Sequence, residues 1–209
     1  MCGRYDLNET GMRLKRLFSV RDVPSFEPHA DLRPTEHALV VRFAGDGQRE
    51  AVLMRWGFAP PSAKDRKDRI NVRAESVGIA YRDAYRSRRC LVPASAFHEW
   101  SGEKGIKTRW RVTVKGEQLF AFAGLWDWWH DPKDPNAAPV EAFTIITTTP
   151  SDILADIHDR MPVIVADSDY QTWLENGSRA LLRPLPSEVI ELEPLGSGAE
   201  IARNHQVDT

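Results

Sequence analysis

The residue with the most distinctive chemistry in this sequence is Cys2, in the opening segment MCGRY. Removal of Met1 would leave a cysteine with a free α-amine beside its thiol. Reference pKa values lie near 8 for the amine and about 8.5 for the thiol, so both have a reactive fraction at neutral pH. The amine of such a 1,2-aminothiol condenses with an aldehyde, and the thiol then closes a thiazolidine ring; acyl transfer by an N-terminal nucleophile is a second use. Simple burial in a core is the alternative.

Polar residues interrupt an apolar, strand-like segment at INVRAES. Asn71, Arg73 and Glu75 are spaced by two, so on a strand all three side chains share one face. Burying such a face is costly unless its groups are paired. The pattern therefore predicts either the lining of a cleft or the solvent-facing side of an edge strand.

Two further segments place acid–base groups next to apolar residues. In AFHEW, His98 and Glu99 point to opposite faces of a strand, so we expect one of them to share the apolar side. A carboxylate against aromatic walls is a candidate for a raised pKa and for proton transfer. In DIHDRMPVIV, His158 precedes Asp159 and Arg160 at a junction where a histidine can move protons near neutral pH. A surface carboxylate and a structural histidine are the alternatives.

The charge distribution favours an anionic ligand at one face of the protein. The net charge is −2, but residues 64–89 hold nine Lys or Arg against four acids, whereas 127–159 hold seven acids and one lysine. Arginine outnumbers lysine 21 to 7, and guanidinium groups suit phosphate oxygens. A solvated helix face is the alternative for the basic segment.

Patterns for metals, disulfides and membranes are absent from the sequence. It has no CxxC, HxxxH or HExxH motif, so no metal and no cofactor are expected. Cys2 and Cys90 make no disulfide framework, which is typical of a reducing cytosol, and Cys90 opens an apolar run that we expect to be buried. Without an 18-residue apolar run or a secretory signal, we expect a cytoplasmic protein with no membrane association.

The hydrophobic patterning predicts an α+β fold. We expect a single domain over 1–209 with a mostly antiparallel, barrel-like β core and short peripheral helices. Residues 196–209 are weakly patterned. The predicted helices are 8–20 with Asn8 as N-cap, 76–88, 151–157 and 168–175. The predicted strands are 38–43 and 51–56 as a hairpin, 91–100 broken by Pro93, 109–114 and 119–126 as a second hairpin, 142–149, and 162–165.

Seven motifs together resemble the SOS-response-associated peptidase family. They occur in the family's order and span residues 1 to about 175. The motifs are MCGRY at 1–5, MRWGFAP at 54–60, NVRAES at 71–76, RCLVPASAFHEW at 89–100, AGLW at 123–126, FTIITT at 143–148 and IHDRMPVIV at 157–165.

The resemblance implies a sensor of abasic sites in single-stranded DNA that acts in the DNA damage (SOS) response. Cys2, exposed by autoproteolytic loss of Met1, would form a covalent thiazolidine with the abasic sugar by lyase-type Schiff-base chemistry. Asn71 would hold the Cys2 region or a sugar hydroxyl. Glu99 would move protons during imine formation and assist removal of Met1, and His158 would protonate the sugar ring oxygen.

The resemblance also implies how DNA is held. Arg4 and Arg73 match phosphate-contacting arginines, Thr147 a backbone-contacting threonine, and Pro34 a wedge against bases; Arg160 is a further candidate contact. We expect a monomer that associates with damaged DNA in the nucleoid.

The sequence departs from the family pattern in two loops. The family's Asn-x-Ala-Pro-Thr stretch is DLRPT at 31–35, with Asp31 for Asn and Arg33 for Ala, and residues 61–63 lack the tryptophans of some members. Two other functions stay open. An N-terminal-nucleophile amidohydrolase would use Cys2 to hydrolyse glutamine, and a non-catalytic reader of single-stranded DNA would use only the basic segment 64–89.

Overall fold

A closed five-stranded barrel forms the centre of the protein in the computed structural model, which describes residues 2–59, 67–103, 106–131, 133–134 and 136–197. Each strand pairs with the next in the order β10-β4-β3-β6-β9, and β9 pairs again with β10. All these pairings are antiparallel except β10 with β4. The barrel strands are β3 (His37–Phe43), β4 (Arg49–Trp56), β6 (Arg89–Ala94), β9 (Phe120–Trp129) and β10 (Val140–Thr148).

Large aromatic side chains fill the core of this barrel. Trp56, Phe122 and Phe143 are fully buried, and Tyr5 joins them from β1. The ring centroids of Tyr5 and Trp56 lie 5.1 Å apart in an edge-to-face arrangement, and those of Trp56 and Phe143 lie 6.2 Å apart and are stacked. Such contacts add to the free energy gained by burying apolar area. They anchor the segment that follows Cys2 to the barrel.

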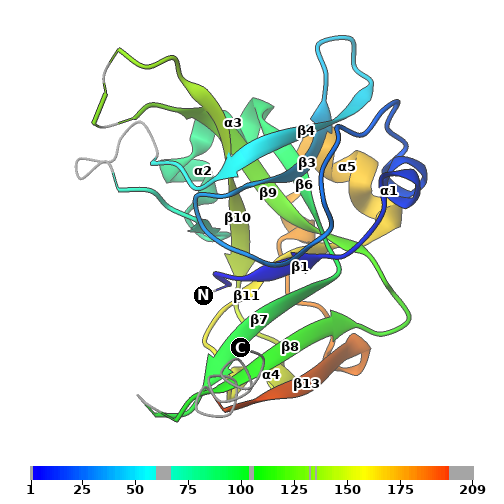
Figure 1. Cartoon of the computed structure of the whole chain (residues 1–209), viewed down its shortest axis with the longest axis vertical. Coiled ribbons are helices and arrows are strands. Elements are labelled where there is room, and N and C mark those ends of the chain that lie inside the picture. The colour runs from blue at the N-terminus through cyan, green and yellow to red at the C-terminus, as the bar shows by residue number, and fades with distance from the viewer. Residues whose placement is uncertain (1, 60–66, 104–105, 132, 135, 198–209) are drawn as a thin grey trace, which may run out of the picture.

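A second, five-stranded sheet lies against the barrel in the order β13-β8-β7-β1-β2. Figure 1 shows β1 between the barrel above it and β7, β8 and β13 below it. The chain thus passes from Cys2 directly into the boundary between the two sheets. The strands of this sheet are β1 (Tyr5–Leu7), β2 (His29–Leu32), β7 (Ala96–Ser101), β8 (Thr108–Val114) and β13 (Ile190–Ser197).

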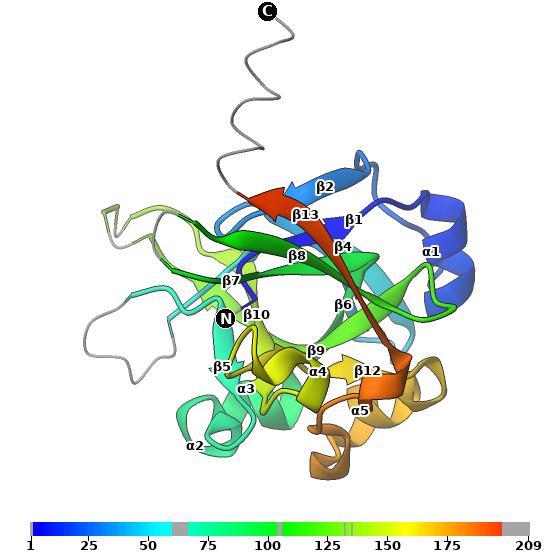
Figure 2. The ribbon, with the colours of Figure 1, turned by 90° about the horizontal axis from the view of Figure 1, so that it is seen from below.

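Short elements complete the fold. Figure 2 shows α2, α3 and α5 on the side of the molecule opposite β2, and β13 crossing from beside α5 toward β2. Strand β5 runs parallel to β10 and carries Asn71 and Arg73 alongside it. The remaining elements are α1 (Gly11–Phe18), β5 (Asn71–Arg73), α2 (Val77–Ala80), α3 (Arg82–Ser87), α4 (Asp152–Ala155), β11 (Met161–Pro162), β12 (Ile164–Val165), α5 (Tyr170–Asn176) and the 3₁₀ turns Asp167–Asp169, Arg179–Leu181 and Ser187–Val189.

The structure confirms the predicted fold class and the first hairpin. The fold is α+β, with a mostly antiparallel barrel and few short helices. Strands β3 and β4 pair in register from His37 opposite Arg55 to Phe43 opposite Arg49. Helix α1 occupies part of the predicted 8–20, but Thr10 rather than Asn8 stands at its N-cap position. A single domain over 1–209 stays a prediction.

Three predictions about strand organisation are wrong. The break predicted at Pro93 in the segment 91–100 falls instead at Ser95, between β6 and β7, which belong to different sheets. The predicted hairpin of 109–114 with 119–126 does not form, because β8 pairs with β7 and β13 while β9 pairs with β6, β10 and β12. The segment 162–165 is likewise divided, since β11 pairs with β10 and β12 pairs with β9.

Among its described residues, the basic segment 64–89 does not present every cation to solvent. Residues 76–88 fold as α2 and α3 rather than as one helix. Arg88 pairs with Asp127 at 2.8 Å. Arg89 donates to the backbone carbonyls of Tyr85 and Arg86 and to those of 173–175, so it binds the ends of α3 and α5 together. Lys64 and Arg66, which contributed to the predicted patch, lie outside the described residues.

Candidate functional site

Cys2 is fully buried, three residues before the first residue of β1. Its Sγ lies 3.7 Å from the backbone oxygen of Arg4. Burial raises the pKa of the Cys2 thiol well above its ordinary value, and the negative charge of Glu99 raises it further. In this environment the thiol holds its proton more tightly than the reference values imply. Cys2 and Cys90 are both buried free cysteines, and burial of Cys90 was predicted.

Asn71 holds the backbone of Cys2 from the barrel side. Its Nδ2 donates to the carbonyl oxygen of Cys2 at 2.8 Å across 69 residues of sequence. Its Oδ1 is buried and accepts no hydrogen bond within the described part of the chain. A buried carbonyl oxygen of this kind is costly to leave unbonded, so it is available to an amine or hydroxyl donor beside Cys2.

Glu99 supplies an ionisable group with a pKa close to neutral. The side chain is 2% exposed on β7, opposite Trp110 of β8. Burial raises the pKa of the Glu99 carboxyl to about 7, and the charge of Asp159 acts in the same direction. The charge of Glu99 acts on the Cys2 thiol, so the carboxyl lies within electrostatic range of it. Glu99 can thus accept or release a proton beside Cys2 near neutral pH.

The prediction that only one of His98 and Glu99 shares the apolar side is incomplete, because both are buried. His98 points to the other face of β7, where its Nε2 lies 2.9 Å from Asp6 Oδ1. Asp6 Oδ1 also accepts the backbone N–H of Asp31 at 2.8 Å. Burial acts to raise the pKa of Asp6, but these hydrogen bonds outweigh it and hold the pKa below its ordinary value. Strand β7 is therefore packed on both faces.

His158 lies on the segment between α4 and β11, next to the charged neighbour that influences Glu99. Its Nδ1 is 3.0 Å from the backbone N–H of Arg160 and 2.9 Å from Asp159 Oδ1. Burial lowers the pKa of His158. A neutral ring that accepts the Arg160 N–H at Nδ1 carries its proton on Nε2. In that state Nε2 is the atom from which His158 can donate, whereas the contact with Asp159 needs the proton on Nδ1, as in the charged ring.

An ion pair between the buried Arg160 and the exposed Glu75 fixes the end of β10 near β5. Arg160 is 8% exposed and binds Glu75 through two parallel contacts of 2.7 and 2.9 Å. It also donates to the carbonyl oxygen of Thr147 at 2.6 Å. Glu75 lies in the turn after β5, so Asn71, Arg73 and Glu75 do not form the single strand face that their spacing predicted. This pair ties the segment of His158 to the segment of Asn71.

The predicted DNA-contacting residues have unequal access to solvent. Arg73 is exposed, and no hydrogen bond or ion pair of its side chain occurs among the described residues. Thr147 is fully buried, with its Oγ1 donating to the Val72 carbonyl at 3.3 Å. Pro34 is half-buried. Arg4 is paired with Asp31, whose other oxygen contacts Arg109 at 2.8 Å.

Sequence reasoning missed Arg109 and the role of Asp31 as its partner. They are 78 residues apart, and their pairing depends on β2 and β8 belonging to one sheet. One feature of the sequence indicated this pairing: position 31 is Asp where the family has Asn. This substitution could have suggested a carboxylate near Arg4, but not its contact with Arg109.

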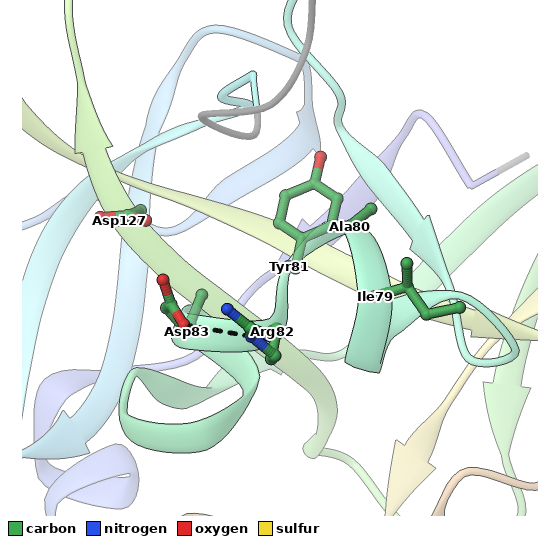
Figure 3. A pocket seen from close by; sticks show the side chains of 7 residues that line it. Ile79, Ala80, Tyr81, Arg82, Asp83 and Asp127 are labelled. Atoms are coloured by element: carbon green, nitrogen blue, oxygen red, sulfur yellow. Dashed lines mark ion pairs between the residues drawn. The ribbon is translucent and has the colours of Figure 1, made fainter.

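Other parts of the surface lack comparable chemistry. A hollow of about 180 Å³ lies at α2 and α3, lined in part by Tyr81, Arg82, Asp83 and Asp127, with Arg82 and Asp83 paired (Figure 3). It brings an acid and a phenol together but holds no cysteine or histidine. Among the described residues, no group of three or more His, Cys, Asp or Glu side chains is arranged to hold a metal ion. None of the helices there is long and apolar enough to cross a membrane.

The fold and the site define an α+β barrel protein with a buried near-N-terminal cysteine held between an amide and an acid. The chain belongs to the SOS response associated peptidase (SRAP) family, whose model matches residues 1–198. The resemblance carried by the seven sequence motifs is thereby confirmed.

Curated relatives and solved structures agree with this membership. The chain is 33% identical to the abasic site processing protein YoqW of Bacillus subtilis, covering 98% of this chain and 96% of that protein. It is 25% identical to the abasic site processing protein HMCES of Xenopus tropicalis, covering 88% of this chain and 66% of that protein. A crystal structure of a Bordetella bronchiseptica protein is similar with a TM-score of 0.79 and 25% identity, covering 93% of this chain and 99% of that one.

Proposed function

We propose that the protein senses abasic sites in single-stranded DNA and bonds to them covalently through Cys2 after autoproteolytic loss of Met1. The observation that carries the proposal is the hydrogen bond of Asn71 to the Cys2 backbone, with Glu99 of pKa about 7 beside the thiol. Two relatives are named abasic site processing proteins, and these names support the proposal. The proposal includes a monomer that acts in the cytoplasm on damaged DNA.

The reaction begins at the α-amine of Cys2. The amine adds to the aldehyde of the open-ring sugar, and loss of water gives an imine. The thiol then adds to the imine carbon, so that a carbon–sulfur bond forms and the thiol proton ends on the nitrogen. A thiol whose pKa is raised keeps its proton until this step. The amine is therefore the first nucleophile and the thiol the second.

Glu99, His158 and Asn71 assist at different points. During removal of Met1, ionised Glu99 accepts a proton from the group that attacks the peptide bond between Met1 and Cys2. During imine formation it accepts a proton from the attacking amine. His158 donates from Nε2 to the sugar ring oxygen, which opens the ring and exposes the aldehyde. Asn71 fixes the position of Cys2, and its Oδ1 accepts from the amine or from a sugar hydroxyl. Arg160 and Glu75 position the segments that carry these groups.

DNA binding is attributed mainly to phosphate contacts, which give affinity without sequence information. Arg73 is exposed at the edge of the site, with no partner for its side chain among the described residues. Arg160 is already bound to Glu75 and Thr147, so we assign it a positioning role in place of a phosphate contact. The absence of a base lets a small pocket reach the sugar without the cost of unstacking one.

The first test is a denaturing gel of the protein with single-stranded DNA that carries one abasic site. We expect a shifted band that requires both the abasic site and Cys2, with intact DNA and Cys2→Ala as controls. Intact mass must show that Met1 has been removed. No shift with Cys2 exposed would exclude the proposal and favour glutamine hydrolysis or plain DNA binding, each of which has its own direct assay.

Replacement of Asn71 by alanine is expected to slow adduct formation by about 10²-fold, because the nucleophile loses its fixed position. The measurement is the single-turnover rate of adduct formation at saturating abasic DNA. Affinity for intact single-stranded DNA should stay within about twofold, which separates positioning from binding. Asn176→Ala, at the last residue of α5, is the matched control. A wild-type rate in Asn71→Ala would remove Asn71 from the site.

A further inference from the structure

Three arginines converge on one carboxylate on the outer face of the second sheet. Arg4 and Arg33 both contact Asp31 Oδ2, the latter at 3.0 Å, and Arg109 contacts Oδ1 at 2.8 Å. Arg4 directly precedes β1, Arg33 directly follows β2, and Arg109 is the second residue of β8. We call Arg4, Arg33, Arg109 and Asp31 the arginine cluster.

The arginine cluster carries more positive charge than its carboxylate can neutralise. Three guanidinium groups against Asp31 leave a net charge of +2. Burial acts to raise the pKa of Asp31, but the hydrogen bonds from Arg4 and Arg33 and the charge of Arg109 outweigh it and hold the pKa low. Asp31 is therefore ionised at neutral pH, and the arginines share it. Glu36, the next acid along the chain, accepts the backbone N–H of Arg33 at 2.8 Å.

The cluster is accessible and partly pre-positioned. The side chains of Arg4, Arg33 and Arg109 are 30%, 58% and 20% exposed, and Asp31 is 22% exposed. The Arg109 guanidinium carbon lies 5.6 Å from the centroid of the Trp100 ring, which supports it from one side. Its buried Nε has no hydrogen-bond partner among the described residues. Guanidinium donors of this kind suit phosphate oxygens.

The position of the cluster connects it to the candidate site. Arg4 is two residues after Cys2, about 7 Å along an extended chain. Glu99 and Trp100 are adjacent on β7, with Glu99 facing the site and Trp100 facing the cluster side. Glu99 and Arg109 thus lie on opposite faces of the β7–β8 pair, and Arg4 is the member of the cluster that links it to Cys2 along the chain.

We propose that Arg4, Arg33 and Arg109 form a subsite for the phosphates of single-stranded DNA, and that Asp31 sets its strength by competing with the phosphates for the three guanidinium groups. This inference rests on the proposed function, because that function determines where the bound DNA strand leaves the site. It assigns Asp31 and Arg33, which depart from the family pattern, a role in tuning affinity. A neutral residue at position 31 would release the arginines to the DNA.

The test measures binding of a fluorescein-labelled intact oligothymidylate by anisotropy at several salt concentrations. The labelled strand has no abasic site, so no adduct can form. Asp31→Asn is expected to bind about three- to tenfold more tightly, because it removes a competing charge. Asn also tolerates the positive φ of 74° at this position. Arg33→Ala and Arg109→Ala should each bind about three- to tenfold more weakly, with a salt slope lower by about 0.7 per lost contact.

Asp46→Asn and Arg21→Ala are matched controls, because they break an exposed Arg–Asp pair at the β3–β4 turn. Neither should change affinity or salt slope. Unchanged or weaker binding by a folded Asp31→Asn would overturn the proposal, and so would arginine variants that behave like Arg21→Ala. Crosslinking at saturating abasic DNA is measured in parallel. If the affinities change as expected but neither the wild type nor any variant crosslinks, the subsite stands and the proposed function fails. If the proteins crosslink but the affinities do not change as expected, only the subsite is rejected.

Discussion

Cys2→Ser is expected to abolish the stable adduct with abasic DNA while a short-lived imine still forms. After loss of Met1, this variant retains the α-amine that attacks the aldehyde. Its hydroxyl is a much weaker nucleophile than sulfur, so ring closure to a stable product fails. The thiol of Cys2 lies buried beside Glu99, where a second, intramolecular attack is favoured by its fixed position.

The measurement compares denaturing gels with and without borohydride, which reduces an imine to a stable amine. Wild-type protein should give the shifted band in both lanes, and Cys2→Ser should give it only with the reductant. Cys90→Ser serves as control for loss of a buried thiol elsewhere, since Cys90 lies in the barrel. A stable Cys2→Ser band without reductant would show that sulfur does not close the product.

The identity of the site residues could be predicted from sequence, but their contacts could not. Cys2, Asn71, Glu99 and His158 lie in motifs with recognisable chemistry. Their meeting depends on pairings across long separations, such as Asn71 with Cys2 and Arg160 with Glu75. Local hydrophobic patterns carry no information on such pairings, which arise from sheet order.

The errors in strand assignment have the same physical origin. The patterns of 109–114 and 119–126, joined by Lys115 and Gly116, fit a hairpin. In the protein these two strands belong to different sheets, because β8 pairs along its length with β13. The hydrophobic pattern of the β13 segment did not predict a strand. The segment 91–100 divides near Ser95, whose backbone N–H binds the Asp6 carbonyl at 2.8 Å.

Charge counting was similarly limited. The excess of arginine in 64–89 indicated an anionic ligand, yet Arg88 and Arg89 make internal contacts with Asp127 and with helix carbonyls. The arginines that gather around Asp31 in the fold are Arg4, Arg33 and Arg109, which lie far apart in sequence. Tertiary structure thus brings together positive charge that a linear count does not reveal.

The two ionisable groups beside each other at the site divide the proton chemistry between them. Burial raises the pKa of both the Cys2 thiol and the Glu99 carboxyl. At neutral pH the thiol keeps its proton, while the carboxyl is near the midpoint of its titration. Glu99 is therefore the group whose protonation state should control the rate of adduct formation around pH 7.

Glu99→Gln is expected to slow adduct formation by about 10²-fold or more at pH 8, where the wild-type carboxyl is ionised and acts as a base. Below its pKa of about 7 the wild-type carboxyl is protonated, so the advantage over glutamine should shrink as pH falls to 5. The α-amine titrates in both proteins. The ratio of wild-type to variant rate therefore removes its contribution and should rise with pH through a midpoint near 7.

Single-turnover rates from pH 5 to 9 at saturating abasic DNA give this ratio. Glu117→Gln, an exposed carboxyl in the turn after β8, should follow the wild-type profile throughout. A ratio that is constant with pH would mean that Glu99 acts only through its shape. A ratio that falls as pH rises would instead assign Glu99 the role of an acid. Its pKa allows this role below pH 7. The attacking amine must lose a proton, however, and this requirement favours a base.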